Sequence, residues 1–428
     1  MRGSRVDEVP TKAAPIWRLA ESPAYLVAML SIAGMFNMGD RMMFSVALSP
    51  IKAEFGFSDS QLGVLSGFAF ALFYAGVAVP ISRLTRYLPR VTIMAICLGL
   101  WSLATGLTAL VSGFATLFAA RMVIGIGEGG GTPMTLSLIA ARYPAERRTM
   151  PIGIFTTAVY VGLILGEWGA GKLIGEIGWR HAFLVLGLPG LLLALLMRLT
   201  VAEPCDLETA PPPNWHRVSE LRHNRAWLHV VGLLIAASFV GYADTAWAPS
   251  FYQRSFGMSV EETGFVTGIA LGMGSTAGAF LAGMIVPRGE KRRPGYGLWL
   301  TFVTTLIAVP LSIASFAVTN QTLSVLCLLI STVLGSIPIV VSYAALQSLV
   351  LPSLRPTATA LAASAYILIG LGAGPAFVGS LSDALTAHFS GESLRAALVI
   401  VNILMAWMLW HAWRAMKLYP AALAAVES

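Results

Sequence analysis

Residues 24–48 read AYLVAMLSIAGMFNMGDRMMFSVAL, an apolar run long enough to cross a membrane as a helix, yet it contains the charged pair Asp40-Arg41. A second apolar run, residues 114–141, contains Arg121 and Glu128. An ionisable group at membrane depth costs at least ~2.5–3.5 kcal/mol on insertion scales, so such groups persist where they face a wet cavity or one another. These four side chains therefore indicate a pathway through a membrane protein.

The composition of the whole chain is that of a protein dissolved in lipid. Of 428 residues, 56% are hydrophobic and only 11% are charged, and the mean hydropathy is +0.74. A helix that crosses ~30 Å of hydrocarbon needs about 20 mostly apolar residues. The sequence contains twelve such windows, near 24–48, 61–82, 91–112, 114–141, 151–175, 181–201, 226–252, 263–286, 295–317, 322–348, 357–383 and 395–416. We therefore predict an all-α membrane protein with twelve transmembrane helices.

The basic residues predict the orientation of the chain. The net charge is +7, but the Lys and Arg residues lie at alternate ends of the predicted helices rather than in one patch, which argues against a nucleic-acid partner. Of the 28, 21 lie on the side of the N-terminus and five on the opposite side. This bias predicts that both termini are cytoplasmic. The first twenty residues lack the features of a signal peptide, so the first helix is expected to be retained.

The sequence predicts no cofactor and no metal. Gly125-x-Gly127-x-x-Gly130 matches a dinucleotide fingerprint, but it lies inside a membrane helix rather than after a strand. Gly166-x-x-x-x-Gly171-Lys172 resembles a P-loop, but Leu173 stands where the metal-binding hydroxyl would be. Small residues in such positions favour close helix packing instead. Three cysteines, Cys97, Cys205 and Cys327, indicate neither a disulfide framework nor a metal site.

The chain repeats itself once. Phe55-Gly56-Phe57-Ser58 recurs as Phe256-Gly257-Met258-Ser259, 201 residues later, and a Pro-x-x-Arg-x-Thr pattern at Pro144 recurs at Pro352. A polar, proline-rich stretch separates the two copies. We predict a six-helix bundle over residues 1–201, a cytoplasmic linker over 202–225 and a second six-helix bundle over 226–428. Two such parallel repeats are typical of transporters in which the bundles rock about a site near the midplane.

Several motifs resemble those of the major facilitator superfamily. Arg121-x-x-x-Gly125-x-Gly127 is similar to its fourth-helix motif, and Gly178-Trp179-Arg180 to the start of its sixth helix. Within the superfamily, residues 121–128, residues 143–148 and Trp247-Ala248-Pro249 resemble the spinster family. The resemblance implies carriage of lysolipids or sphingolipid-like molecules, with proton coupling in some members. For a bacterial-type homologue, it also implies a multi-pass protein of the inner (plasma) membrane, and we expect a monomer.

One superfamily signature is missing. The loop after the second helix ordinarily carries an aspartate that helps to latch the two halves, but residues 80–87 read PISRLTRY, without an acid. The equivalent place after the eighth helix, residues 285–288, lacks one too. We therefore predict a cytoplasmic gate that is held by apolar packing and by other charges.

The intramembrane charges are the predicted working residues. At ~1.5 Å per residue, Asp40 and Arg121 lie ~14 and ~10 Å below the outer ends of their helices, and Glu128 lies ~21 Å below. Their depths predict an Asp40–Arg121 pair first, and second a Glu128 side chain that reaches toward Arg41 or water. We assign proton coupling to Asp40 and Glu128, and binding of an anionic group to the arginines, with Glu128 also in the substrate site. The structural alternative is a static cluster that joins the two helices.

Further candidates lie in the fifth and seventh helices. Asp244 is placed like Asp40 in the repeat, and we assign it, Tyr242 and Trp247 to the substrate site. Glu167 is a secondary candidate, with a solvated position near the outer third as the alternative. Most aromatic residues of this kind pack helices or face lipid, but a minority lining a cavity would suit an amphiphilic substrate.

We therefore predict a secondary active transporter, driven by protons, that moves an amphiphilic anionic small molecule by alternating access through the lipid bilayer. A drug efflux or soluble organic-anion carrier of the same superfamily is the alternative. A membrane receptor or an intramembrane enzyme is less favoured, because the sequence shows no nucleophile with a base, no paired catalytic aspartates and no His-Glu-x-x-His signature.

Overall fold

The computed structural model describes residues 21–144, 147–203, 219, 221–389 and 391–427, so Cys205 and most of the predicted linker lie outside it. Within these ranges the chain is helical and contains no strand, as predicted. The first half comprises α2 (Pro23–Phe55), α3 (Asp59–Ser66), α4 (Phe68–Leu84), α5 (Arg90–Leu107), α6 (Phe114–Arg142) and α7 (Thr149–Thr200). The second half comprises α9 (Arg225–Phe256), α10 (Val260–Thr267), η4 (Gly268–Met273), α11 (Gly274–Glu290), α12 (Tyr296–Ala317), α13 (Gln321–Ser348), α14 (Arg355–Tyr366), η6 (Ile367–Ala373), α15 (Gly374–Leu385), α16 (Ser393–Leu404) and α17 (Trp407–Glu427).

These helices supply the predicted membrane crossings. Nine helical stretches of the described residues are long and apolar enough to span a bilayer. The longest, α7, turns at Gly178, whose φ of 77° is a left-handed conformation that favours glycine, so it contains two crossings. The charged helices α2 and α6, with 33 and 29 residues, are also long enough. Every predicted window therefore has its helix among the described residues.

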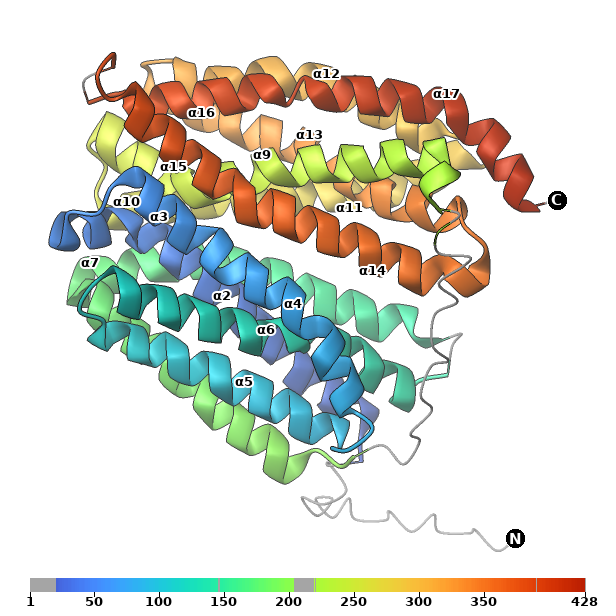
Figure 1. The fold of residues 1–428 in the computed structure, drawn as a ribbon, viewed down its shortest axis with the longest axis horizontal. Coiled ribbons are helices and arrows are strands. Elements are labelled where there is room, and N and C mark those ends of the chain that lie inside the picture. The colour runs from blue at the N-terminus through green and yellow to red at the C-terminus, as the bar shows by residue number, and fades with distance from the viewer. Residues whose placement is uncertain (1–20, 145–146, 204–218, 220, 390, 428) are drawn as a thin grey trace, which may run out of the picture.

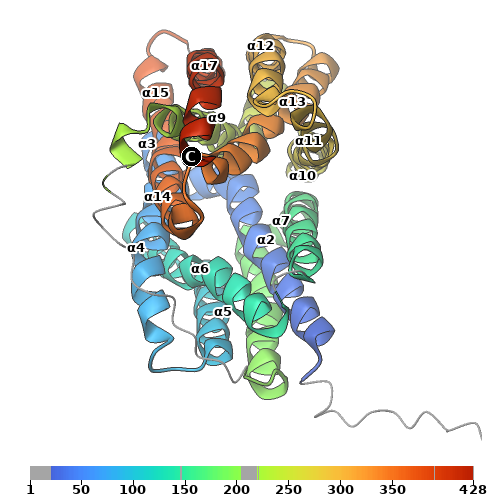
Figure 2. The same ribbon diagram turned by 90° about the vertical axis from the view of Figure 1, so that its right-hand side faces the viewer.

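The two halves lie side by side as separate groups of helices. Helices α2 to α7 form one group and α9 to α17 the other (Figures 1 and 2). The helix α2 starts, and α17 finishes, at the same end of the molecule, at the right of Figure 1. We call this the terminus end and the opposite one the distal end. The predicted domain boundaries themselves stay a prediction.

The internal repeat is visible in matching local structures at the distal end. Gly56 and Gly257 end α2 and α9 with almost identical left-handed angles, φ 68° and 67°. Ser58 and Ser259 then begin the next helix, each in a capping box. Arg180 donates to the carbonyls of Ala109 and Val111, and Arg395 donates in the same way to those of Phe316 and Val318. Each arginine thereby satisfies carbonyls in the last turn of a helical segment and just after it, which otherwise lack partners.

Glycines let the backbones of α2 and α7 touch. A Cβ atom at Gly162 would lie 2.5 Å from the carbonyl oxygen of Met35, and one at Gly166 would lie 2.7 Å from the Cα of Gly39. The predicted close packing of the fifth helix is therefore present, and it lies within the first half. A Cβ atom at Gly169, on the same helix, would have no neighbour among the described residues within 4 Å.

The close backbone contact between α2 and α7 predicts different effects of the same substitution at two glycines of α7. Gly162→Ala should destabilise the protein by about 1–3 kcal/mol, because the new methyl group overpacks a backbone contact. Gly169→Ala should be neutral or stabilising by roughly 0.5–1 kcal/mol, since it only raises helix propensity. Melting temperatures in detergent measure the difference. Equal values for the two variants would contradict a tight backbone contact at Gly162.

Candidate functional site

The central ion pair joins α2 to α6. Arg41 Nε donates to Glu128 Oε2 at 2.6 Å, and the Glu128 side chain is fully buried. The guanidinium carbon of Arg41 lies 4.7 Å from the ring centre of Phe70 and 4.9 Å from that of Tyr74, which are cation–π distances. The second predicted pair is therefore present, and aromatic rings of α4 hold its cation in place.

The first predicted pair is wrong. Among the described residues no ion pair joins Asp40 to Arg121. Asp40 Oδ2 instead accepts a hydrogen bond of 3.1 Å from Thr105 of α5. Arg121 Nε donates to the carbonyl oxygen of Leu65 at 3.2 Å, and its guanidinium stacks 4.3 Å from the centre of the Phe44 ring. Similar depth did not bring the two groups together, because their side chains leave the helices toward different neighbours.

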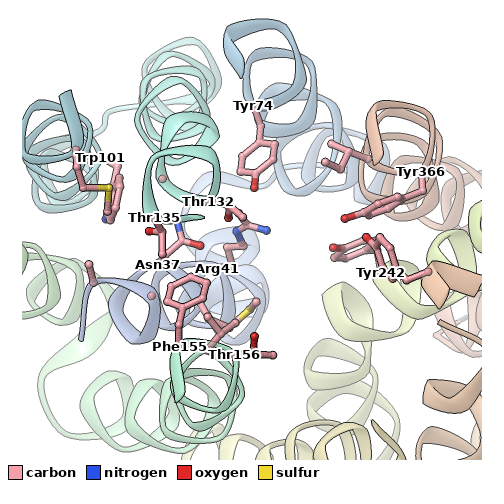
Figure 3. A pocket seen from close by; sticks show the side chains of 18 residues that line it. Asn37, Arg41, Tyr74, Trp101, Thr132, Thr135, Phe155, Thr156, Tyr242 and Tyr366 are labelled. Carbon is pink, nitrogen blue, oxygen red and sulfur yellow. The ribbon is translucent and has the colours of Figure 1, made fainter. Parts of the chain in front are cut away.

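A cavity of about 350 Å³ lies beside Arg41, between the two halves (Figure 3). Helices α2, α4, α5, α6 and α7 form one wall, and α9, α13, α14 and η6 the other. Arg41 is the only charged residue among the described ones that line it. The other polar residues of the lining are Asn37, Tyr74, Thr132, Thr135, Thr156, Tyr242, Tyr343 and Tyr366, and the larger apolar ones are Met38, Met94, Trp101, Phe155, Val159 and Ile367.

The guanidinium of Arg41 points into this cavity, and tyrosines face it. Figure 3 shows Arg41 near the centre, with Tyr74 on the same half and Tyr242 and Tyr366 across the space. Only Nε of Arg41 has a hydrogen-bond partner among the described residues. The two terminal nitrogens are therefore free to bind an acceptor that enters the cavity.

The other predicted residues lie elsewhere. Asp244 is buried inside the second half, where it accepts a hydrogen bond of 2.9 Å from Asn402. Trp247 is fully buried and donates to the carbonyl of Pro375 at 2.9 Å. Glu167 is not solvated but completely buried, between α7 and α10. Of the C-terminal candidates, only Tyr242 lines the cavity, and the binding roles of the others stay predictions.

Sequence reasoning missed most of the polar lining. Of these residues, only Asn37 could have been recognised from the sequence. It lies one turn before Arg41, and an amide inside an apolar run needs a partner. The tyrosines of α4, α13 and α14 stand among apolar residues at no distinctive spacing. They come together only because α4, α13 and α14 converge on the cavity.

Polar contacts close the distal end of the interface between the halves. Asp59 of α3 accepts from Arg254 of α9 at 2.9 Å, from Ser382 of α15 at 2.7 Å and from Lys52 of α2 at 2.5 Å. Asp383 of α15 in turn accepts from the backbone amide of Asp59 at 3.0 Å. We call Asp59, Arg254, Ser382 and Asp383 the distal latch.

The cavity lies on the terminus side of this latch. Deeper contacts between the halves, such as Ser45 Oγ to the Ala246 carbonyl at 3.1 Å, also lie between the cavity and the distal end. The composition of the predicted gate at the terminus end stays a prediction.

This architecture, two six-helix groups around a central cavity closed at one end, is that of a membrane transporter. The sequence model of the Major Facilitator Superfamily matches residues 30–375, and the chain belongs to this superfamily. An "MFS-type efflux pump" of Mycolicibacterium smegmatis (strain ATCC 700084 / mc(2)155) is 32% identical over 381 residues, which cover 88% of each chain. A "Probable galactarate/D-glucarate transporter GudP" of Bacillus subtilis (strain 168) is 26% identical, over 70% of this chain and 71% of the relative.

Among solved structures the chain is similar to a bacterial homologue of the human lysosomal transporter Spinster. In its inward-facing and unoccupied conformation that protein superimposes with a TM-score of 0.86, at 26% identity, over 96% of this chain and 99% of the relative. Its inward-facing and occupied conformation gives a TM-score of 0.77, at 27% identity, over 96% and 97%. The predicted membership of the superfamily and the resemblance to spinster are confirmed.

The distal latch predicts how the conformational equilibrium responds to loss of one charge. Asp59→Asn leaves Arg254 without its anion, and removing one partner of a pair that is largely shielded from water is costly. The variant should therefore populate a distally open state at least tenfold more than the unchanged protein. Distances between spin labels at the exposed distal positions 112 and 319 report the opening.

The control for this experiment is Glu176→Gln. Glu176 also lies near the distal end, but its pair with Lys172 is long, 3.9 Å, and more than half of each side chain is exposed, so its loss should change nothing measurable. A distance distribution for Asp59→Asn that matches that of Glu176→Gln would rule out the latch.

Proposed function

We propose that this protein is a secondary active transporter that moves an amphiphilic anionic small molecule by alternating access. The observation that carries the proposal is the position of Arg41. Its charge is the only one on the lining formed by described residues, and its Nε is held by Glu128 while its terminal nitrogens stay available. A guanidinium fixed in this way suits a carboxylate or phosphate, which it can bind through two parallel hydrogen bonds.

The remainder of the lining suits a molecule with an apolar part. Met38, Met94, Phe155 and Val159 supply aliphatic and aromatic surface beside Arg41. Methionines adapt to irregular shapes, and binding pockets generally combine such surface with a few placed polar groups. The composition of the cavity therefore supports an amphiphile, the class of substrate that the resemblance to the spinster family implies.

The basic residues support the orientation of the transporter. Lys and Arg are concentrated on the terminus side, which favours the cytoplasm there. In this orientation the cavity belongs to an inward-facing conformation, and the distal latch closes the outer side. Alternating access then requires the latch to open while the terminus end closes.

The alternative substrate is a soluble organic anion. The hydroxyl groups of Thr132, Thr135 and Thr156 and of the facing tyrosines offer many hydrogen bonds to a hydroxylated acid. Relatives named as galactarate/D-glucarate and cis,cis-muconate transporters agree with this class. Uptake into proteoliposomes, with lysophospholipids, sugar acids and uncharged amphiphiles offered separately, distinguishes the two. Binding of a ligand without its uptake would instead indicate a receptor.

The anion site predicts a graded loss of affinity at Arg41. Arg41→Lys keeps the charge without the planar fork and should weaken binding of an anionic substrate about tenfold, and Arg41→Ala by about a hundredfold or more. An uncharged analogue should bind all three proteins similarly. Arg121→Lys is the comparison, because Arg121 was predicted to hold the anion but does not line the cavity in this conformation.

Titration of ligand binding in detergent measures these constants. An equal loss of affinity for charged and uncharged ligands in Arg41→Ala, with the protein still folded, would contradict an anion site there. A larger loss of affinity in Arg121→Lys than in Arg41→Lys would indicate that Arg121 binds the anionic group, as the sequence alone suggested.

Proton coupling is proposed to involve Asp40 and Glu128. Both carboxyl groups are buried next to the cavity, Asp40 beside Arg41 in the chain and Glu128 in contact with it, so opening and closing of the cavity changes their access to water. Asp40→Asn should abolish accumulation driven by a pH gradient while leaving exchange of substrate without a gradient intact. Glu128→Gln should do the same, with a lower melting temperature because Arg41 loses its anion.

The matched control is Thr105→Val, which removes the hydrogen bond to Asp40 but keeps its carboxyl group. This variant should retain gradient-driven accumulation, with a shifted pH dependence. Accumulation by Asp40→Asn and Glu128→Gln at the level of the unchanged protein would refute the assignment of coupling to these two residues.

A further inference from the structure

Glu167 is a buried carboxyl group that the transport cavity does not use. Its side chain has no solvent exposure, and it is absent from the lining of the cavity. Oε2 accepts a hydrogen bond of 2.7 Å from Thr267, whose hydroxyl also donates to the Thr263 carbonyl. Oε1 has no hydrogen-bond partner among the described residues. One oxygen of this carboxyl group is therefore buried and unsatisfied.

Glu167 lies at the interface between the two halves. It belongs to α7, whereas Thr267 belongs to α10 and is followed at once by the π-helix η4. Gly178 marks the distal turn of α7, eleven residues later, so Glu167 lies ~16 Å from the distal end. When the distal end opens, α7 and α10 must separate, and Glu167 becomes exposed to water on that side.

Glycines make this part of the interface too tight for water. A Cβ atom at Gly171 would lie 2.8 Å from the Val260 carbonyl and 3.0 Å from the Cα of Gly264. A Cβ atom at Gly264 would in turn collide with the carbonyl of Glu167 itself. On the other side of the carboxyl group, a Cβ atom at Gly268 would lie 3.2 Å from the Ile164 carbonyl. The backbones are thus close together on both sides of it, so the closed interface cannot hydrate it.

The charged groups of the surrounding helices are engaged elsewhere. From α2, Asp40 bonds to Thr105 and Arg41 to Glu128. On α7 itself, Lys172 and Glu176 form an exposed pair.

The remaining neighbours offer no free cation either, since Arg254 of α9, which packs on α10, is paired with Asp59. On α10, Glu261 and Glu262 are exposed, and Glu262 accepts from Ser259. Helix α13, which packs on η4, has no Asp, Glu, Lys or Arg. No described cation is thus paired with Glu167, and a buried carboxylate without one is very costly.

We propose that Glu167 is a proton-binding site of the distal gate, which must hold a proton for the halves to close over it and which exchanges that proton with the distal side only. The closed interface accommodates the neutral acid, and the open one the hydrated carboxylate. Opening therefore releases a proton, and acidification favours closure. Glu167 sets the balance of conformations without carrying the transported proton, because it does not reach the cavity.

The size of the expected pH effect follows from the linkage between proton binding and conformation. Where the closed state holds the proton and the open state does not, the closed-to-open ratio changes about tenfold for each pH unit.

The test uses the full chain in lipid nanodiscs, without substrate, so its result does not depend on which molecule is transported. Spin labels at Ser112→Cys and Thr319→Cys, two exposed distal positions, report the separation of the halves in a Cys205→Ser background. Cys97 and Cys327 are buried and remain unlabelled. Distances are measured from pH 5 to pH 9.

The protein with Glu167 should become progressively more open as pH rises, by up to about tenfold in the population ratio per pH unit. Glu167→Gln should stay closed throughout, because glutamine is neutral at every pH. The exposed carboxyl groups on the same helices supply the controls, and Glu176→Gln and Glu261→Gln should behave like the unchanged protein. A pH response of Glu167→Gln equal to that of the unchanged protein, or a mainly open Glu167→Gln, would overturn the proposal.

Thr267→Val provides a second measurement that holds even if Glu167→Gln does not fold. Loss of the hydroxyl removes the one donor to the carboxylate in the closed state and changes the open state little. At acid pH this variant should match the unchanged protein, and at alkaline pH it should be more open. Equal opening of the two proteins at pH 9 would also overturn the proposal.

Discussion

The cost of an ionised side chain in a place without water governs the arrangement of this protein. Arg41 is tolerated at membrane depth because Glu128 bonds to it, aromatic rings of α4 cover its guanidinium and its far side faces the cavity. Asp40 obtains a hydroxyl donor from Thr105, and Asp244 an amide donor from Asn402. Each intramembrane charge thus has a partner on a different helix, and the pairs determine how the helices face each other.

Glycines allow close backbone contacts both within each half and at the interface between the halves. Gly67 approaches Gly372 across the interface, and Gly171 approaches Gly264. Contacts between backbones immobilise few side chains and interlock little surface. Two bundles that meet in this way can therefore separate as rigid bodies. The π-helical turns η4 and η6 lie at these same crossings, where broken helices are typical of transporters.

The two ends of the interface are held by different means. The distal end has charged and hydrogen-bonded contacts in which Asp59 and Asp383 are the acceptors, whereas the loops of the terminus end lack the acid that relatives use there. The distally closed state is therefore favoured by specific polar contacts, and the opposite state is predicted to depend on less directional ones. This asymmetry agrees with the high structural similarity to the inward-facing, unoccupied spinster homologue.

The sequence by itself determined the class of protein, the twelve helices, the internal repeat and the charged residues at membrane depth, because hydrophobic length and the cost of buried charge leave few alternatives. It also located Arg41 and Glu128 and ranked their pairing second. What it could not supply was the direction in which each side chain leaves its helix, since depth follows from residue number but the facing neighbour depends on how helices pack. Only the tertiary structure turned Asp40 toward Thr105, gathered the tyrosines of four helices around Arg41 and buried Glu167 between the halves, because these contacts join segments that are from 33 to more than 300 residues apart in the chain.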